Sequence, residues 1–237
     1  MKLAFFGRGQ MGRVVQARAR DAGHEVGAVL GSDARGTPAE LARVLAGHDA
    51  AIDFSVAPVV LRHVTACVEA RVPLVEGTTG WRDQEPEARR LVAEGGGALL
   101  IGANFSIGVQ LFYRIVDRAA ELFAGLKAYD AFIEEEHHAA KRDAPSGTAL
   151  ELNRLLGQRL GGEVAISSTR AGHIPGVHRV GFDSAADQVM LMHSARSRDG
   201  FAGGALAAAR WLRGRSGVYA FADVFDQVLE GERRAVP

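Results

Sequence analysis

The sequence has too few cysteines for a disulfide-stabilised or zinc-stabilised fold. Its 237 residues include one cysteine, Cys67, so an internal disulfide is impossible. The same scarcity argues against a structural zinc site, and we expect no bound metal. A chain of this length can bury roughly 70–75% of its unfolded surface, so its core needs no such cross-link. A single thiol also suits a reducing compartment.

The sequence also lacks an excess of either charge. Its 28 basic and 28 acidic residues give a formal net charge of zero, which argues against a nucleic-acid or membrane-surface partner. No window approaches the roughly 18 apolar residues that a membrane span requires. The apolar run near the N-terminus is too short for a signal peptide. We therefore expect a cytoplasmic protein.

The first hundred residues alternate between short apolar runs and stretches with helical spacing. This alternation predicts a parallel sheet covered by helices on both faces, which is a Rossmann-type, doubly wound α/β domain. The expected strands cover Leu3–Phe6, Val26–Leu30, Ala50–Phe54, Pro73–Val75 and Ala98–Ile101. The expected helices cover Met11–Ala22, Pro38–Leu45, Pro58–Ala70 and Gln84–Ala93.

From about Gly108 the pattern changes, which places a domain boundary between residues 107 and 108. Long helical stretches now alternate with extended ones separated by Gly, Pro and Asp turns, which predicts an α+β domain with a mixed or antiparallel sheet. The expected helices cover Val109–Phe123, Ala149–Leu160, Phe201–Leu212 and Ala222–Leu229. The expected extended segments cover Lys127–His138, Val164–Thr169, Val177–Asp183 and Gln188–Ser194.

A glycine-rich loop follows the first expected strand and opens the first expected helix. It reads Gly7-Arg8-Gly9-Gln10-Met11-Gly12. In such a loop the first glycine makes the tight turn, the second admits the pyrophosphate of a dinucleotide, and the third allows close packing of the helix. The N–H groups and the dipole at the helix start then face the anion. In this position the loop predicts dinucleotide binding, rather than an ordinary glycine-rich turn.

The end of the second strand bears on the choice between NADH and NADPH. NAD-specific domains place an acidic residue there, which binds the ribose hydroxyls and repels a 2′-phosphate. Here that position is Gly31 or Ser32, and Arg35 or Arg8 could pair with the phosphate. Asp33, if turned inward, would restore the NAD-type contact. We expect NADPH to be used at least as well as NADH.

Two more turns lie at the carboxyl ends of expected parallel strands, where open α/β sheets bind ligands. Both are rich in ordinary turn residues, so neither alone is decisive. Together with the glycine loop they are expected to line one side of a nicotinamide pocket. The first turn contains Gly77-Thr78-Thr79-Gly80, and the second contains Gly102-Ala103-Asn104-Phe105-Ser106.

The most informative string begins with two histidines, His137 and His138, followed by Lys141 and a Pro-Ser-Gly-Thr turn. An imidazole can exchange a proton near neutral pH. Ser146 is a good N-cap, so Gly147 and Thr148 would present helix-start N–H groups to a carboxylate. Lys141 could supply a charge for a second carboxylate, or a proton. This set predicts reduction of an anionic, conjugated or imine substrate, with hydride from the cofactor and a proton from the protein.

Two nearby stretches are open to more than one interpretation. The run Glu134-Glu135-Glu136 reads as a partly solvated strand end, although any of the three could orient a histidine. The histidines His173 and His178 lie in and after a turn-rich stretch and could be structural. That stretch could also close over the substrate, since loops often carry function.

The histidine string resembles the signature of the 4-hydroxy-tetrahydrodipicolinate reductases, formerly called dihydrodipicolinate reductases. In this chain it reads His137-His138-x-x-Lys141-x-Asp143-Ala144-Pro145-Ser146-Gly147-Thr148. The supporting strings occur in the same order: the glycine loop, Gly77-Thr78-Thr79-Gly80 and Asn104-Phe105-Ser106-Ile107-Gly108. The resemblance covers essentially the whole chain.

The resemblance implies a specific reaction and site. The reaction would be the NAD(P)H-dependent conversion of 4-hydroxy-tetrahydrodipicolinate to tetrahydrodipicolinate in the lysine and diaminopimelate pathway. His137 would be the general acid/base and Lys141 a proton donor, while the substrate carboxylates would be held by His138, Gly147 and Thr148. The cofactor would be contacted by Gly7 to Gly12, by Gly77, Thr78 and Thr79, and by Gly102, Ala103, Asn104 and Phe105. The family plan further implies a substrate-binding and oligomerisation domain over residues 108–216. A C-terminal helix over 217–237 would return to the dinucleotide-binding domain (1–107), and the assembly would be a homotetramer.

The chain departs from the family pattern at three points. Its glycine loop is one residue shorter than the usual Gly-x-x-Gly-x-x-Gly, the region between Gly176 and Asp199 is short, and the acidic residue after strand two is missing. Two rival functions also remain open: another small two-domain dehydrogenase, for example one acting on aspartate, and a non-catalytic dinucleotide sensor. Neither explains the His-His-x-x-Lys string before Pro-Ser-Gly-Thr.

Overall fold

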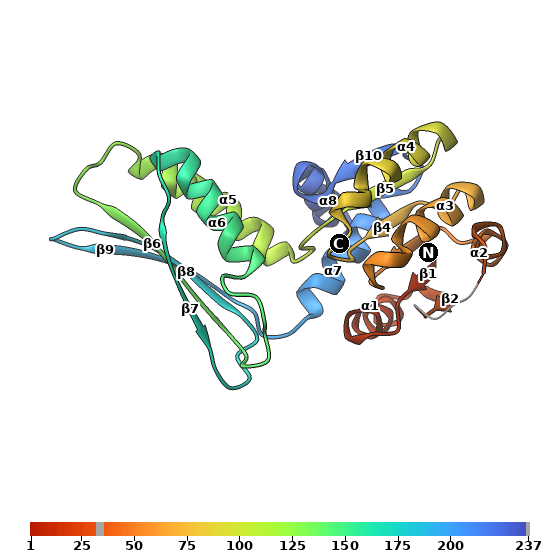
Figure 1. The fold of residues 1–237 in the computed structure, drawn as a ribbon, viewed down its shortest axis with the longest axis horizontal. Coiled ribbons are helices and arrows are strands. Elements are labelled where there is room, and N and C mark those ends of the chain that lie inside the picture. Colours follow the sequence, from red (N-terminus) through yellow and green to blue (C-terminus); the bar gives the residue numbers. More distant parts are fainter. Residues whose placement is uncertain (32–35, 236–237) are drawn as a thin grey trace. The chain divides into compact units, whose positions relative to one another are not determined.

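The computed structural model describes residues 1–31 and 36–235 and divides the chain into two compact units (Figure 1). The first unit comprises Met1–Ser106 and Arg198–Pro237, and the second comprises Ile107–Ser197. The chain thus returns to the first unit at Arg198, earlier than the predicted boundary between residues 216 and 217. The physical reason is helix α7, Asp199–Leu212, whose alanine-rich buried face packs on α1 and on the central strands of the first unit.

The first unit is built on a six-stranded sheet with the order β10-β5-β4-β3-β1-β2, in which all neighbours are parallel. The strands are β1 Lys2–Phe6, β2 Glu25–Leu30, β3 Ala50–Asp53, β4 Leu74–Glu76, β5 Ala98–Ile101 and β10 Gly217–Ala220. The strand order reverses between β1 and β3, which makes their carboxyl ends the switch point of a Rossmann-type fold. The predicted architecture of this region is confirmed.

Helices cover both faces of this sheet. Helices α1, Gln10–Asp21, and α7 contact each other on one face. The other face carries α2 Pro38–Leu45, α3 Val60–Ala70 and α4 Glu85–Gly95, whose apolar residues form one cluster with those of the strands. Helix α8, Phe221–Ala235, contacts α7 and β10. The inner strands β1, β3, β4 and β5 are mostly apolar because both of their faces are covered, whereas the edge strands β2 and β10 are only partly buried.

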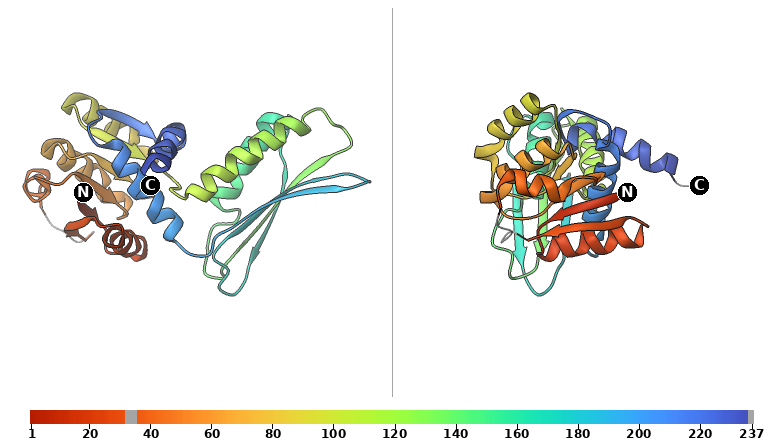
Figure 2. Two further views of the ribbon diagram at one scale, coloured as in Figure 1. Left: turned by 180° about the vertical axis from the view of Figure 1, so that it is seen from behind. Right: turned by 90° about the vertical axis from the view of Figure 1, so that its right-hand side faces the viewer.

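The second unit has a four-stranded sheet with two helices on one face (Figures 1 and 2). The strand order is β7-β6-β8-β9; β6 and β7 are parallel, and the other pairs are antiparallel. The strands are β6 Asp130–His137, β7 Ala165–Arg170, β8 Val177–Asp183 and β9 Gln188–Ser194, and the helices are α5 Ile107–Phe123 and α6 Gly147–Leu160. Their shared core contains Phe112, Val116, Ile133, Leu152 and Phe182. The predicted α+β domain with a mixed sheet is therefore confirmed.

Local signals account for several element ends. Helix α2 begins with a capping box, in which Thr37 and Glu40 satisfy each other's backbone N–H groups. Helix α6 begins at the expected N-cap, Ser146, and ends at Gly161 in the left-handed conformation. Strand β10 was not predicted from the sequence. Within the described residues, no helix is long and apolar enough to cross a membrane.

Candidate functional site

The glycine loop lies at the switch point of the first sheet. Gly7 follows β1 with a φ of 99°, and a Cβ on it would lie 2.3 Å from the carbonyl oxygen of Phe54, which follows β3. A Cβ on Gly12 would lie 2.3 Å from the carbonyl oxygen of Gly7. These two positions accept only glycine, because the loop, the end of β3 and the first turn of α1 are in close contact.

The helix start beyond this turn is open. Gly9 is the N-cap of α1. A Cβ added to Gly9 would have open space around it, with no neighbouring atom within 4 Å. No side chain caps the helix, and its first turn, which begins with Gln10 and Met11, has no acidic residue. The N–H groups of this turn have no partners within the helix, so they are available to a pyrophosphate. The loop therefore fits a dinucleotide.

The residues expected near the adenosine ribose are described only in part. Arg8 is exposed, and its Nη2 donates a hydrogen bond to the carbonyl oxygen of Val29 at 3.0 Å. Val29 is the second-last residue of β2, so this guanidinium lies at the strand end that the sequence assigned to ribose recognition. Ser32, Asp33 and Arg35 lie outside the described residues.

The turns after β4 and β5 lie side by side because their strands are neighbours. The N–H of Gly77 donates to the carbonyl of Asp53 at 2.9 Å, and that of Gly102 to the carbonyl of Glu76 at 3.0 Å. A Cβ on Gly77 would lie 2.2 Å from the ring of Phe54. In the first turn Thr78 is half-buried and Thr79 exposed; in the second Ala103 is exposed, Phe105 is buried, and the Asn104 side chain accepts from the Ser106 N–H at 2.9 Å. The structure thus places both turns at the carboxyl edge that carries the glycine loop.

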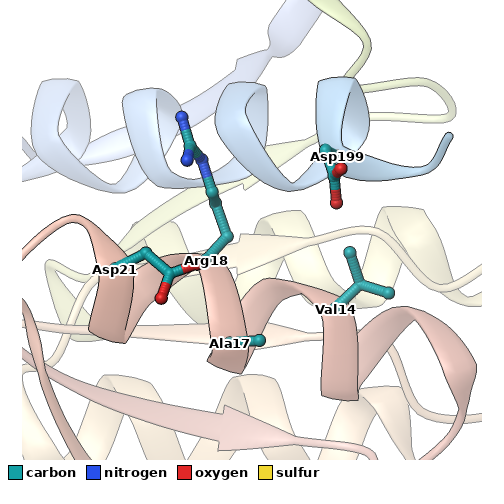
Figure 3. Close-up of a pocket in the computed structure, with 5 residues that line it drawn as sticks. All are labelled: Val14, Ala17, Arg18, Asp21 and Asp199. Atoms are coloured by element: carbon teal, nitrogen blue, oxygen red, sulfur yellow. The ribbon is translucent and has the colours of Figure 1, made fainter. Parts of the chain in front are cut away.

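A separate hollow lies between α1 and α7 (Figure 3). Its lining residues are Val14, Ala17, Arg18, Asp21 and Asp199. The four residues from α1 lie beyond its first turn, and the lining includes none of the residues predicted for the site. We assign it no part in the chemistry.

In the second unit, His137 is the last residue of β6 and is buried. Its Nδ1 lies 3.2 Å from Oε2 of Glu135, and its ring meets that of His178 edge-on at 5.1 Å between centroids. Gly176, with a φ of 143°, approaches the other nitrogen so closely that a Cβ would lie 3.2 Å from Nε2. Burial lowers the pKa of His137, the charge of Glu135 opposes this shift, and the charge of Lys141 adds to it.

Glu135 lies at the centre of the cluster. Its Oε1 accepts hydrogen bonds from Ser168 Oγ and an Arg170 guanidinium nitrogen, both at 2.7 Å, and from the Ser146 N–H at 3.0 Å. Burial by itself raises the pKa of this carboxyl, but the hydrogen bonds from Ser146, Arg170 and Ser168 outweigh burial and lower the pKa to about 2. Glu135 is therefore a carboxylate at any physiological pH.

His178 connects this carboxylate to the start of α6. Its Nε2 lies 3.1 Å from Ser146 Oγ and 3.7 Å from Oε2 of Glu135. Burial, together with the charge of His137, lowers the pKa of His178 to about 4. Ser146 in turn accepts a hydrogen bond from the Ala149 N–H at 3.2 Å as the N-cap of α6. His178 is thus a neutral support for the helix start, whereas His173 is exposed.

The remaining predicted residues surround this cluster. Lys141 is half-buried, and its Nζ donates to both carboxylate oxygens of Asp143 at 2.7 and 2.8 Å. His138 is half-buried, and its carbonyl accepts from the Lys141 N–H at 3.0 Å. Gly147 is exposed with open space beside it, and the Thr148 side chain is hydrogen bonded to Tyr113. The second unit therefore gathers all five predicted catalytic and substrate-binding residues near the start of α6.

Comparisons with known proteins identify the family to which the chain belongs. Residues 1–105 match the model of the dihydrodipicolinate reductase N-terminus, and residues 108–225 match that of the C-terminus. The chain belongs to the dihydrodipicolinate reductase family. It is therefore an oxidoreductase that uses NADH or NADPH.

Relatives support the assignment to this family over nearly the full length. The 4-hydroxy-tetrahydrodipicolinate reductase of Christiangramia forsetii is 33% identical, over 97% of this chain and 100% of the relative. That of Anaeromyxobacter dehalogenans strain 2CP-1 is 36% identical, over 90% of this chain and 86% of the relative. The dipicolinate-bound dihydrodipicolinate reductase of Paenisporosarcina sp. TG-14 has the same fold, with a TM-score of 0.78, 21% identity, and coverage of 94% of this chain and 99% of that one.

Three residues of the cluster were not among the predicted site residues: Glu135, Arg170 and His178. The sequence raised Glu135 only as one of three glutamates that could orient a histidine, and His178 only as part of a stretch that could close over the substrate. Alternation along β6 places Glu135 on the same face as His137, so the sequence contained a signal for it. Arg170 pairs with His137 between β6 and β7, and His178 pairs with Glu135 between β6 and β8. Both positions depend on strand register, which the sequence alone does not reveal.

Glu135, His137 and His178 also have ligand atoms close enough to surround a metal ion. The three hydrogen bonds to Glu135 all go to Oε1, one of them from the cationic Arg170, whereas Oε2 faces the two histidines. A metal cation there would lie beside a guanidinium that is 2.7 Å from the same carboxylate. The charge of this guanidinium disfavours a metal cation at the cluster.

Proposed function

We propose that this enzyme reduces 4-hydroxy-tetrahydrodipicolinate to tetrahydrodipicolinate in the lysine and diaminopimelate pathway, in the cytoplasm. The observation that carries the proposal is the buried cluster of His137, Glu135 and His178 beside the start of α6. The names of the relatives support the reaction, and the single cysteine, Cys67, supports a reducing compartment such as the cytoplasm. NADH or NADPH supplies the hydride when bound.

The start of α6 and the residues around it bind the substrate in this proposal. The N–H groups of Gly147 and Thr148 belong to the first turn, and with the helix dipole they favour a carboxylate. Lys141 offers a mobile positive charge 2.7 Å from Asp143, so it can exchange this partner for a second substrate carboxylate. His138, which precedes this loop, supplies a further donor.

His137 holds the proton that completes the reduction. Its pKa is lowered by burial, while the Glu135 carboxylate stabilises its protonated form. Because burial and the Glu135 charge act on the pKa in opposite directions, His137 can give up its proton near neutral pH. In the net reaction the hydride takes the place of the substrate hydroxyl, and the hydroxyl takes up one proton and leaves as water, so one proton is consumed for each NADH or NADPH oxidised. Lys141 lies in the same loop and can return a proton to the site.

A coupled assay tests the proposed reaction. The substrate is generated enzymatically and the oxidation of NADPH or NADH is followed, with aspartate plus NAD⁺ or NADP⁺ as the parallel substrate pair. We expect turnover with 4-hydroxy-tetrahydrodipicolinate only. Turnover with aspartate would favour an amino-acid dehydrogenase, and cofactor binding without any turnover would favour a dinucleotide sensor.

The sheet of the second unit is where we place the homotetramer contacts. Helices α5 and α6 cover one face of this sheet, whereas Met190 and Met192 on the edge strand β9 are 40% and 60% exposed. Exposed apolar side chains on an edge strand favour burial against another copy of the chain. Light scattering at micromolar concentration is expected to give the mass of a tetramer, and the mass of a monomer would refute this arrangement.

A further inference from the structure

A second buried polar cluster lies beneath the turn that follows β4. Asp53 is the last residue of β3 and Glu76 the last of β4, and the two are paired directly in the sheet. His63 comes from α3, and its ring contacts that of Phe6, the last residue of β1. All three polar side chains are 0% exposed. None takes part in the proton chemistry proposed above, so their burial needs another explanation.

Asp53 joins α3 to the turn. One carboxylate oxygen, Oδ2, lies 2.6 Å from Nδ1 of His63, whose ring stacks on Phe6 at 3.9 Å between centroids. The other oxygen, Oδ1, accepts the N–H of Ser55 at 2.8 Å and the hydroxyl of Thr78 at 3.3 Å. One carboxyl group thus fixes a helix and two loop residues.

Glu76 holds the same turn through the backbone. Its Oε1 accepts the Thr78 N–H at 2.6 Å, whereas its Oε2 is buried and accepts no hydrogen bond from the described residues. Asp53 and Glu76 are paired in the sheet and both carboxyls are buried. Two ionised carboxylates at such neighbouring buried positions repel each other. Burial, and then the charge of Asp53, raise the pKa of Glu76 well above its usual range, which favours its neutral form.

We infer that Asp53, His63 and Glu76 form a buried polar network that positions the Gly77–Thr79 turn for the dinucleotide. The inference rests on the proposed cofactor contacts of this turn. The network holds Thr78 by its N–H and its hydroxyl, and the Trp81 indole N–H donates to the Thr78 carbonyl at 2.9 Å. A turn held at three points enters the complex already ordered, so binding loses less conformational entropy.

The proton on Glu76 makes the network sensitive to pH. The titratable groups that face this carboxyl are Asp53 from β3 and Cys67 from α3, and its partner on β5 is the apolar Ile101. His63 from α3 faces Asp53. Loss of the proton would leave two buried carboxylates side by side, which repel each other. The turn would then lose its support, and the affinity for the cofactor would fall as pH rises.

The experiment measures the Kd of NADPH by fluorescence titration from pH 6 to pH 10, with the thermal midpoint of each variant. Glu76→Leu removes the acceptor of the Thr78 N–H, and we expect the Kd to rise about tenfold at pH 7. Glu76→Gln keeps an acceptor and a permanent donor, so its Kd should match that of the wild type at pH 7. The Kd of this variant should also be independent of pH, whereas that of the wild type should rise once Glu76 loses its proton.

Cys67→Ala is the matched control, because Cys67 is buried on α3 beside the network but makes no hydrogen bond to the turn. It should lower the thermal midpoint and leave the Kd unchanged. If Glu76→Leu loses stability but keeps the wild-type Kd, the inference is overturned while the proposed cofactor site stands. Equal pH dependence of the Kd in Glu76→Gln and wild type has the same meaning. If Glu76→Leu does not fold, the Glu76→Gln profile decides. A wild-type protein that binds neither NADPH nor NADH overturns the cofactor site as well.

Discussion

The two units each bury a glutamate in the last three residues of a strand, and the pKa values of the two carboxyls are shifted in opposite directions. Glu135 is 1% exposed and Glu76 is 0% exposed, so burial alone cannot distinguish them. The pKa of Glu135 is nevertheless lowered to about 2, whereas that of Glu76 is raised well above its usual range. The difference lies in what each carboxyl faces.

Glu135 faces three donors, including the cationic Arg170, and these repay the cost of burying a charge. Glu76 faces one backbone N–H and the carboxylate of Asp53, so it is more stable as the neutral acid. The second unit therefore keeps a fixed negative charge near His137, while the first unit uses a neutral acid to hold a turn. Substitutions in the second unit should therefore change turnover and its pH dependence, whereas substitutions in the first unit should change cofactor binding.

The largest effect is expected from His137→Gln, which removes the proton that the second unit supplies. We expect turnover to fall by about 10²–10⁴, the usual range for a positioned acid or base. The Kd of NADPH should stay at the wild-type value, because the glycine loop and the two turns belong to the first unit. Steady-state kinetics and a binding titration measure the two quantities. Unchanged turnover would remove His137 from its proposed role.

Glu135→Gln is expected to have the next largest effect, on stability. The carboxylate has a pKa lowered from 4.5 to about 2, so its contribution is fully present above pH 4.5 and is lost as pH falls towards 2. That contribution is on the order of 3 kcal/mol at pH 7. Denaturant unfolding of wild type and variant should show a difference of this size at pH 7 that shrinks below pH 4.

The same variant should also change the pH dependence of the reaction. The Glu135 charge raises the pKa of His137, so its removal should move the His137 limb of the kcat/KM profile to lower pH. Glu136→Gln is the matched control, because Glu136 lies on the opposite face of β6 and pairs with Arg179. A control that shifts the profile as far as Glu135→Gln would show that general surface charge is responsible.

Thr148→Val should have a smaller effect, confined to substrate binding. Loss of a hydroxyl donor to a carboxylate costs about 1.5–3 kcal/mol, so the KM for the substrate should rise by about 10- to 150-fold. Tyr113→Phe is the control, because it removes the tyrosine hydroxyl that is hydrogen bonded to Thr148 and keeps the threonine. Equal increases in KM from both variants would mean that Thr148 acts through Tyr113. A change in the KM for NADPH alone would place Thr148 elsewhere.

The smallest effect is expected in the first unit, from Arg8→Ala. The Arg8 guanidinium lies at the end of β2, 3.0 Å from the Val29 carbonyl, where it can pair with a 2′-phosphate. Because this side chain is exposed, its loss should lower kcat/KM for NADPH by about tenfold and leave that for NADH unchanged. A wild-type enzyme that prefers NADH by tenfold or more would contradict the predicted tolerance of NADPH.

The sequence predicted most of the fold because its local patterns are strong. Apolar runs such as Leu3–Phe6 and Ala98–Ile101 correspond to β1 and β5 within one residue at each end. Ser146 was correctly predicted as the N-cap of α6. Strand β10 was missed because Gly217–Ala220 contains only four residues and pairs with β5, which lies more than one hundred residues earlier.

The glycine loop and the histidine string were visible because each is contiguous in sequence. The contacts among Glu135, Arg170 and His178 could not be predicted in the same way, because these residues come from three different strands. Glu135 meets Arg170 and His178 only through the register of β6 with β7 and β8. A shift of one residue in either pairing would turn these side chains to the other face. Propensity and spacing do not determine such pairings.

The interleaved order of the two units has a consequence for synthesis on the ribosome. The first unit needs β10 beside β5 and α7 against α1, and both follow the whole of the second unit in the chain. Translation at roughly 5–20 residues per second therefore exposes β5 as an open edge for at least several seconds. The second unit is continuous from Ile107 to Ser197 and can complete its core during that interval. The second unit can thus fold completely before the first unit, although synthesis of the first unit begins earlier.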